Sequence, residues 1–486
     1  MSVVHPWSNE TYPPKRTFRA AACHARPASD RRRLLPLSSL PTSPHSPTHV
    51  PRHFSSGRFG FLWGASAASS IGDGLALVAF PLLATTVTRN PALIAGVAVA
   101  TRLPWLLLSL PAGAVADRVD RRRLLMVVEA SRMIVLLLLG AAIATGRTSL
   151  AAVYLAAFTL GAFQILYVGA TQAVLPAMVR NDRLSNANSQ LFVAQTSGEQ
   201  FLGPAIGGLA FAAMASLPFL ADGVSFAISG ALLALAFPRR SHRRVRPAND
   251  IRASMRWDMR QGLVWFARHR VLRLVGAMVA TFAFCQSMGA AILVVFGLRV
   301  LHLSGSGFGV FVAVAAVGNL AGAVVVPRLL RRIGTAGTML SAGVFAGISY
   351  VVMGTAGSVP VALAALTCEA FAVGVGMVAS AVLRQTLIPS ELAGRVNVVM
   401  RSCAYGAATI GALVGGTLAA VGGARLPFIL GGSAEFVGAL AIGLPLARIL
   451  SASRRTDDRV TADIEAWISS PAEDVRTSAL VIDEVA

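Results

Sequence analysis

Acidic residues lie inside several long apolar runs of this sequence, where a charge is rare unless it has a specific task. Asp73, Glu199, Glu369 and Glu435 each stand well inside such a run. A charged side chain at the centre of a bilayer costs roughly 2.5–3.5 kcal/mol on insertion scales, so it normally faces a polar cavity or a partner. A carboxyl group in that position can take up and release a proton. These acids are candidate proton-exchange sites, Asp73 first and Glu199 second.

Basic residues in the same runs could pair with acids. Arg102 lies in the run after the one that contains Asp73, and we predict that it is the charge partner of this acid. Glu129 and Arg132 are three residues apart, a spacing that favours a local ion pair on one helix. The sequence therefore predicts two separate pairs of opposite charge.

Composition and run length indicate a membrane protein. Hydrophobic residues make up 55% of the chain and charged residues only 13%, whereas a soluble chain exposes far more charge. Apolar runs of about 20 residues can cross a bilayer as helices. The sequence predicts an all-α membrane protein with twelve transmembrane helices in two six-helix bundles. The expected spans are 59–86, 92–116, 124–145, 150–174, 191–213, 217–237, 272–296, 308–326, 338–355, 359–383, 396–421 and 426–446.

Polar segments flank and separate the two predicted bundles. Residues 58–237 and 271–447 are the bundles, and the basic residues 238–270 connect them in the cytoplasm. Residues 1–57 are rich in Pro, Ser and Arg without an apolar run, which predicts a disordered cytoplasmic extension. Residues 448–486 are expected to be a solvated, acidic cytoplasmic tail.

Arginine is concentrated in alternate loops, and this pattern predicts the orientation. Loops near Arg123, Arg183, Arg332 and Arg395 are rich in arginine, and the other loops carry isolated arginines only: Arg89, Arg147, Arg299 and Arg425. Because cytoplasmic loops hold the excess of basic residues, both termini are expected in the cytoplasm. The formal net charge of +21 does not indicate nucleic-acid binding, since the arginines lie in short loops rather than on one folded basic face.

Internal repeats support a duplicated six-helix unit. Three short sequence features recur in the same order in the two halves. Parallel repeats of this kind occur in transporters whose two bundles rock about a central site. The pairs are 172–176 with 385–389, 203–208 with 411–416, and Gly113 with Gly322.

The stretch GAVADRVDRRR, at residues 113–123, follows the second predicted span. Gly113 lets helix ends approach closely because it has no side chain. Asp117 can pair with Arg118 or Arg121, and such a polar contact can hold one side closed and break in another state. We therefore predict a conformational latch formed by Gly113, Asp117, Arg118, Arg121 and Arg122.

The fifth predicted span contains SGEQFLGPAIGG at residues 197–208. Its glycines form a smooth face for close helix contact, and its proline removes one backbone hydrogen bond and bends the helix. The motif residues are Gly198, Gly203, Pro204, Gly207 and Gly208.

Both stretches resemble signatures of the major facilitator superfamily: the loop between helices 2 and 3, and the antiporter motif of helix 5. That loop usually has glycine where this chain has Asp120. Residues 62–83, 101–118 and 175–188 are similar to the exporter branch that includes macrolide-efflux and enterobactin-export proteins. The resemblance implies alternating access in a bacterial-type cell membrane, and export of drug-, antibiotic- or siderophore-like amphipathic molecules by proton antiport.

Polar and aromatic residues in the spans are candidates for lining a substrate cavity. They are Trp105, Phe163, Gln164, Gln195, Gln200, Gln286, Asn319 and Phe371. Two other charged residues, Asp222 and Arg401, are expected near span ends, with their charges reaching toward the interface.

Other functions stay open at this point. A proton-coupled uptake symporter is the alternative transporter, and a non-transporting membrane sensor is a different class. An enzyme is not expected, since the sequence has neither an HExxH motif nor a phosphate-binding GxxxxGK[ST] loop. The four scattered cysteines indicate neither a metal site nor a disulfide framework. We expect no cofactor; the partners are a small-molecule substrate, protons and the lipid bilayer, with the protein a monomer.

Overall fold

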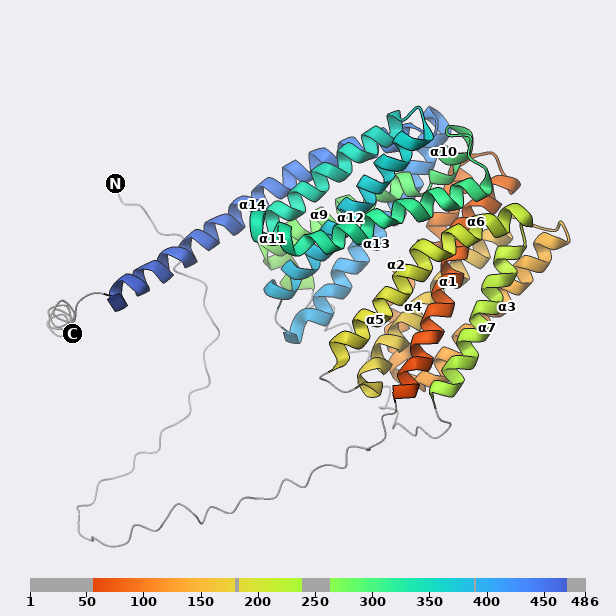
Figure 1. Cartoon of the computed structure of the whole chain (residues 1–486), viewed down its shortest axis with the longest axis horizontal. Helices are drawn as coiled ribbons and strands as arrows, with labels where there is room; N and C mark the ends of the chain where they lie inside the picture. The colour runs from red at the N-terminus through yellow and green to blue at the C-terminus, as the bar shows by residue number, and fades with distance from the viewer. Residues whose placement is uncertain (1–55, 180–182, 238–262, 389, 470–486) are drawn as a thin grey trace, which may run out of the picture. The chain divides into compact units, whose positions relative to one another are not determined.

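A computed structural model of the chain describes residues 56–179, 183–237, 263–388 and 390–469 (Figure 1). Side chains at 109–118 and 451–469 are among those outside the description. Within the described ranges the regular elements are helices, and no strand occurs. The first half contains α1 (Ser56–Val87), α2 (Pro91–Arg118), α3 (Arg121–Ala144), α4 (Leu150–Met178), α5 (Leu184–Thr196), η2 (Ser197–Leu202), α6 (Gly203–Ala213) and α7 (Leu217–Ala236). The second half contains α9 (Arg270–Ala290), α10 (Leu293–Arg299), α11 (Gly305–Thr355), α12 (Val359–Leu387), α13 (Ser390–Gly422) and α14 (Leu426–Ser469).

The helices account for the predicted spans. Ten helical segments of the described chain are long and apolar enough to cross a membrane. The run α5–η2–α6 is a further helical segment, interrupted by a π-helical turn. The 51-residue α11 contains two spans, because Gly334 has non-helical angles (φ 71°, ψ 174°) that divide it. The structure is therefore an all-α membrane fold consistent with the twelve expected helices.

Two boundaries differ from the prediction. The expected span 272–296 is divided into α9 and α10 by a break after Ala290. Helix α14 continues to Ser469, so the first part of the expected solvated tail is helical. The extension 1–57, most of the connector 238–270 and the end of the tail lie largely outside the described residues, and these predictions stay untested.

An aromatic pair occurs at the corresponding place in each half. Phe80 of α1 packs edge-on against Phe219 of α7, with ring centroids 5.1 Å apart. Phe296 of α10 meets Phe428 of α14 in the same way at 5.0 Å. Phe219 and Phe428 are each the third residue of an LPF sequence. The first and last spans of each half therefore share one contact, as a duplicated unit would.

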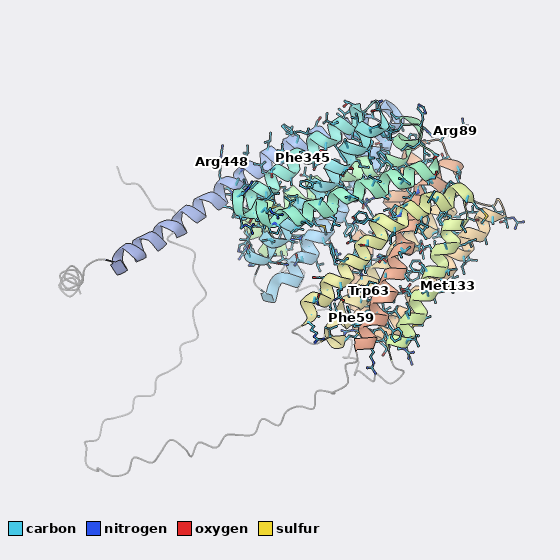
Figure 2. All side chains as sticks on the ribbon, viewed as in Figure 1. Phe59, Trp63, Arg89, Met133, Phe345 and Arg448 are labelled. Atoms are coloured by element: carbon cyan, nitrogen blue, oxygen red, sulfur yellow. The ribbon has the colours of Figure 1, made fainter. Side chains whose placement is uncertain are left out.

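The halves share an apolar core at one end only. We call this the Arg89 end, because the loops with Arg89, Arg147, Arg299 and Arg425 lie there; Figure 2 shows Arg89 and Phe59 at opposite ends of the first half. One apolar cluster at the Arg89 end joins Val78 to Val294, and Arg299 donates a hydrogen bond to the Arg89 carbonyl at 2.8 Å. Toward the Phe59 end the halves have separate cores, one around Leu125 and one around Leu272.

Glycines allow the two halves to touch at the Arg89 end. A Cβ atom on Gly208 of α6 would lie 2.7 Å from the Cα atom of Gly309 of α11. This distance is shorter than real Cβ contacts, so the helices meet backbone to backbone, as small residues permit in membranes.

Candidate functional site

Arg132 of α3 is a fully buried cation in the interior of the first half, with 1% of its side chain exposed. Its Nη2 atom lies 3.9 Å from Oδ1 of Asp73 on α1. Its guanidinium also lies over the rings of Tyr167 (5.3 Å) and Phe226 (4.8 Å), contacts that stabilise a buried cation. Arg132 is thus held by α1, α4 and α7 together.

Three more acids surround this pair. Glu129 of α3 is 1% exposed and accepts a hydrogen bond from the Ser229 hydroxyl at 2.7 Å. Asp222 of α7, also 1% exposed, accepts one from Ser225 at 3.2 Å. Glu199 of η2 is exposed and lies within electrostatic range of both partners of the ion pair. We call this set the Arg132 cluster: Asp73, Glu129, Arg132, Glu199 and Asp222.

Glycine brings α1 onto the acid of α7. A side chain at Gly72 would collide with the Asp222 carboxylate and the Ser225 hydroxyl. Asp73 follows Gly72 directly, so the same close approach places it beside the cluster. The acids are therefore gathered by helix packing rather than by neighbouring sequence.

The structure changes the predicted pairing. Asp73 pairs with Arg132 rather than with Arg102, whose guanidinium donates to the Ala98 carbonyl on its own helix at 3.5 Å. The predicted local pair of Glu129 with Arg132 gives way to the contact between Glu129 and Ser229.

Asp222 lies five residues from the start of its span, as expected, but the prediction that its charge reaches toward the interface is wrong. Asp222 is buried in the cluster. A signal for this was present, because Asp222, Ser225 and Ser229 recur at spacings of three and four in an apolar helix. Such spacing places them on one face, and that polar face must turn toward partners.

Glu199 lies on a distorted turn of the helix that carries the glycine motif. The backbone N–H of Gly203 donates to the Gly198 carbonyl, five residues back, and Pro204 cannot donate to the Gln200 carbonyl because it has no N–H. The result is the π-helix η2, a form that occurs frequently at functional sites.

The motif glycines hold this turn against α1. A Cβ atom on Gly198 would lie 2.9 Å from the Ile71 nitrogen, and one on Gly74 would lie 2.8 Å from the Gly203 Cα atom. Gly207 continues the contact along Leu75. The predicted helix-5 motif therefore makes the close contact expected of it, and the segment that carries Glu199 rests on the helix that carries Asp73.

A groove of about 590 Å³ opens between α1, α5 and η2. It is mainly apolar, and Trp63 at its edge donates a hydrogen bond to the Gln190 carbonyl at 3.3 Å. Its lining is Trp63, Ala67, Ile71, Ser189, Gln190, Val193, Ala194, Ser197, Gly198 and Leu202. None of the predicted cavity residues lines this groove.

Those cavity candidates are dispersed over both halves. Trp105 stacks on Tyr405 at the contact of α2 with α13, Phe163 packs in an apolar cluster of the first half, and Phe371 meets Phe345 edge-on at 6.3 Å. The Oε1 atom of Gln164 is buried without a partner among the described atoms. The other predicted cavity residues are half-buried: Gln195, Gln200, Gln286 and Asn319.

The predicted acids of the second half lie close together. Glu369 of α12 is 5% exposed and Glu435 of α14 is 3% exposed. They are within electrostatic range of each other, and each has a buried Oε1 atom without a hydrogen-bond partner in the described part of the chain. Tyr350, whose hydroxyl donates to the Gln286 carbonyl at 2.9 Å, lies near both acids.

Only some residues of the predicted latch have side chains that the structure describes. The side chains of Gly113, Asp117 and Arg118 lie outside the described residues, whereas Arg121 and Arg122 begin α3. Asp120, which replaces the usual glycine, caps α3 by accepting a hydrogen bond from the Arg123 backbone at 3.0 Å. An aspartate at this position therefore supports the turn instead of disturbing it.

Comparison with known proteins identifies the family. The profile of the family described as "Transmembrane secretion effector" matches residues 48–465. The chain is 28% identical over 425 residues to the multidrug efflux pump Tap of Mycobacterium tuberculosis, covering 81% of this chain and 94% of the relative. It is 26% identical over 359 residues to the enterobactin exporter EntS of Citrobacter koseri, covering 71% and 80%.

Solved structures show the same fold. The nucleoside transporter NupG superposes with a TM-score of 0.64 at 12% identity, covering 80% of this chain and 99% of the other. A bacterial homologue of the iron transporter ferroportin gives 0.62 at 18% identity, covering 80% and 98%. Both are similar in fold alone. The chain therefore belongs to the transmembrane secretion effector family of major facilitator transporters, a family of transporters and not of enzymes.

Proposed function

We propose that this protein exports amphipathic small molecules from the cytoplasm in exchange for protons, by alternating access of its two halves. The outward direction of transport is supported by two relatives, one named an efflux pump and the other an exporter. Their sequences cover most of this chain, so the likeness extends over both halves.

The Arg132 cluster is the observation that carries proton exchange. It places four carboxyl groups around one guanidinium inside a membrane bundle. With every group ionised, the cluster would hold a net charge of minus three, which is very costly in a membrane interior. The cluster therefore holds protons, and their number can change when the contacts of Arg132 change.

Exposure falls stepwise from the edge of the cluster to its centre. Glu199 is exposed, the Asp73 side chain is 25% exposed, and Arg132 is 1% exposed. A proton can thus reach Asp73 from the side of Glu199. Because η2 rests on α1 through glycines, a movement of this turn would change access to Asp73.

The groove beside η2 has the size and character of a ligand site. Its volume of about 590 Å³ lies within the range of small-molecule pockets, which are mostly apolar with a few polar groups. Gly198 belongs both to the groove and to the turn that carries Glu199. A ligand in this groove would therefore press on the turn that controls access to Asp73.

Orientation and energetics fit export. The arginine-rich loops indicate that the Phe59 end, where the halves have separate cores, faces the cytoplasm.

The proton gradient supplies enough free energy for export. One proton that enters through about 100 mV yields roughly 2.3 kcal/mol, and one pH unit adds about 1.4 kcal/mol. The sum sustains a substrate gradient of several hundredfold.

Everted membrane vesicles test the proposal. Vesicles are acidified inside, a panel of antibiotics and siderophores is added, and proton release from the lumen is followed with a pH-sensitive dye. We expect release that depends on the substrate and on this protein, and its loss in Asp73→Asn. Asp120→Asn is the matched control, because Asp120 is exposed and asparagine also caps a helix.

Transport that persists after a protonophore has collapsed the gradient would refute proton exchange. Unchanged proton release in Asp73→Asn would remove Asp73 from the proposed site.

A further inference from the structure

Arginines and aromatic rings meet where α2 contacts α13. The Arg401 guanidinium lies 4.9 Å from the centroid of the Trp105 ring, and Trp105 stacks on Tyr405 at 4.7 Å with an interplanar angle of 14°. Arg102 lies one turn from Trp105 on α2 and within electrostatic range of Tyr405. Arg384 of α12 lies within range of Arg401. We call these five residues the Arg401 cluster.

The cluster holds positive charge. Among the side chains that the structure describes, no ion pair joins Arg102, Arg384 or Arg401 to a carboxylate, whereas Arg132 has Asp73. Like charges that lie close together repel each other, so Arg384 and Arg401 raise the energy of the empty site. An anion between them would relieve this repulsion.

Retention of cytoplasmic loops does not explain the ring contact of Arg401. An arginine that serves topology only has to stay on the cytoplasmic side, whereas Arg401 lies over the ring of Trp105 on α2. Arg401 lies five residues from the start of the candidate span Val396–Gly422, so its expected place near a span end is confirmed. Its side chain is exposed but is held by the indole ring.

The cluster lies at the border between the shared core and the separate cores. On α13, Ala412 belongs to the apolar cluster that also contains Ala95 of α2. One residue before Arg401, Met400 belongs to the core of the second half alone. The Arg401 cluster thus lies where the two halves begin to separate, toward the predicted cytoplasmic side.

We propose that the Arg401 cluster binds the anionic group of the exported molecule, which makes the substrate an amphipathic organic anion. The cation–π contact with Trp105 holds the Arg401 guanidinium through its charge rather than through a hydrogen bond, and guanidinium N–H groups match a carboxylate or phosphate with two parallel bonds. The flat surface of Trp105 and Tyr405 suits an aromatic or other planar body. This inference rests on the proposed export function and specifies its substrate class.

The site would also link substrate to conformation. Arg102 and Trp105 come from the first half, and Arg384, Arg401 and Tyr405 come from the second. One bound anion therefore contacts both halves, and it stabilises the arrangement in which they are closest together. A ligand shifts a conformational equilibrium only by such differential contacts.

Two dyes with the same xanthene ring and opposite charge test the inference. Fluorescein is anionic and rhodamine 123 is cationic, and the binding of each to the purified full-length protein is measured by fluorescence anisotropy. We expect fluorescein to bind, and Arg401→Gln and Arg384→Gln each to weaken it by about tenfold or more, because hydrogen bonds to charged groups are the strong ones. Arg147→Gln, at an exposed loop position, is the matched control and leaves binding unchanged.

Two outcomes would overturn the inference. In the first, the wild type and both variants bind fluorescein equally well. In the second, the substitutions weaken the binding of rhodamine 123 as much as the binding of fluorescein. Arg384→Gln keeps the test decisive if Arg401→Gln does not fold.

The binding assay on purified protein and the proton-release assay in vesicles together separate the two proposals. Exchange of rhodamine 123 for protons, without arginine-dependent binding of fluorescein, would refute the anion site and leave proton-coupled export standing. Arginine-dependent binding of fluorescein, without any proton release in vesicles, would refute the export mechanism and support the anion site.

Discussion

The two halves share their packing and differ in their charges. Phe80 with Phe219 and Phe296 with Phe428 form the same edge-on contact in each half. The first half surrounds a buried arginine with acids, whereas the second half buries Glu369 and Glu435 without a basic partner among the described side chains. The two halves therefore share an apolar packing contact while their buried polar residues differ.

This difference indicates a division of tasks. In the mechanism that we propose, the first half exchanges protons, because its buried cation Arg132 lies among several acids. The second half contributes Arg384, Arg401 and Tyr405 to the proposed substrate site. If the two halves were functionally equivalent, corresponding substitutions in them would have corresponding effects.

The largest effect is expected for Arg132→Met, which removes the only cation that the structure places in the first-half cluster. Removing one partner of a buried ion pair costs about 3–5 kcal/mol, because the other charge stays buried. We expect a lower free energy of unfolding in detergent and loss of transport. Arg147→Met, at an exposed position, should change stability by less than about 0.5 kcal/mol. Equal stability of the two variants would contradict a structural role for the buried pair.

A smaller effect is expected where the halves touch. Gly208→Ala places a methyl group against the backbone at Gly309, and overpacking of this kind costs about 1–3 kcal/mol. Gly60→Ala is the matched control, since a Cβ atom there meets nothing within 4 Å. Thermal unfolding of the purified variants measures the difference. A stable and fully active Gly208→Ala protein would show that the halves need not meet closely at the Arg89 end.

The aromatic pairs test whether the scaffold is truly equivalent in both halves. Phe219→Leu removes one edge-on pair, with Phe80, whereas Phe428→Leu removes two, with Phe296 and with Tyr350. Each such pair contributes about 0.5–1.5 kcal/mol, so we expect both variants to lose unfolding free energy and Phe428→Leu to lose more, by about the contribution of one pair. A large loss in one half and none in the other would mean that the packing has diverged along with the charges.

The smallest effect concerns the junction of α2 and α3. Asp120→Ala removes the cap of α3, a change that costs about 0.5–1 kcal/mol at an exposed helix end. Asp120→Asn should retain the stability, because asparagine caps equally well. The second half has no such turn to cap, since Gly334 bends α11 instead. Identical unfolding temperatures for the alanine and asparagine variants would argue against capping.

The fold could be predicted because its determinants are local along the chain. Apolar run length defines the spans, and repeated short sequences indicate the duplication. Asp73 could also be identified as a candidate site residue, since a carboxylate within an apolar run is unusual wherever the helix lies. The predicted loop between spans 308–326 and 338–355 contains the break at Gly334. The break after Ala290 and the helical part of the tail depend on local backbone preference and were not predicted.

The partners of the charged residues could not be predicted in the same way. Pairing depends on which helices are neighbours and how each is rotated, so the sequence paired Asp73 with Arg102 and left Arg132 to Glu129, whereas the structure pairs Asp73 with Arg132. Glycines signal that a helix makes a close contact but not with which helix. The contact of Arg401 with Trp105 joins the two halves, and no pattern within one span specifies it.

The most direct test compares one acid from each half in everted vesicles. Substrate-dependent proton release is measured for the wild type, Asp73→Asn and Glu435→Gln, with equal amounts of folded protein. If proton exchange takes place in the first half, Asp73→Asn abolishes the release and Glu435→Gln retains at least about half of it, since neutralising a remote acid leaves the Arg132 cluster intact. Full release in Asp73→Asn together with its loss in Glu435→Gln would contradict the account.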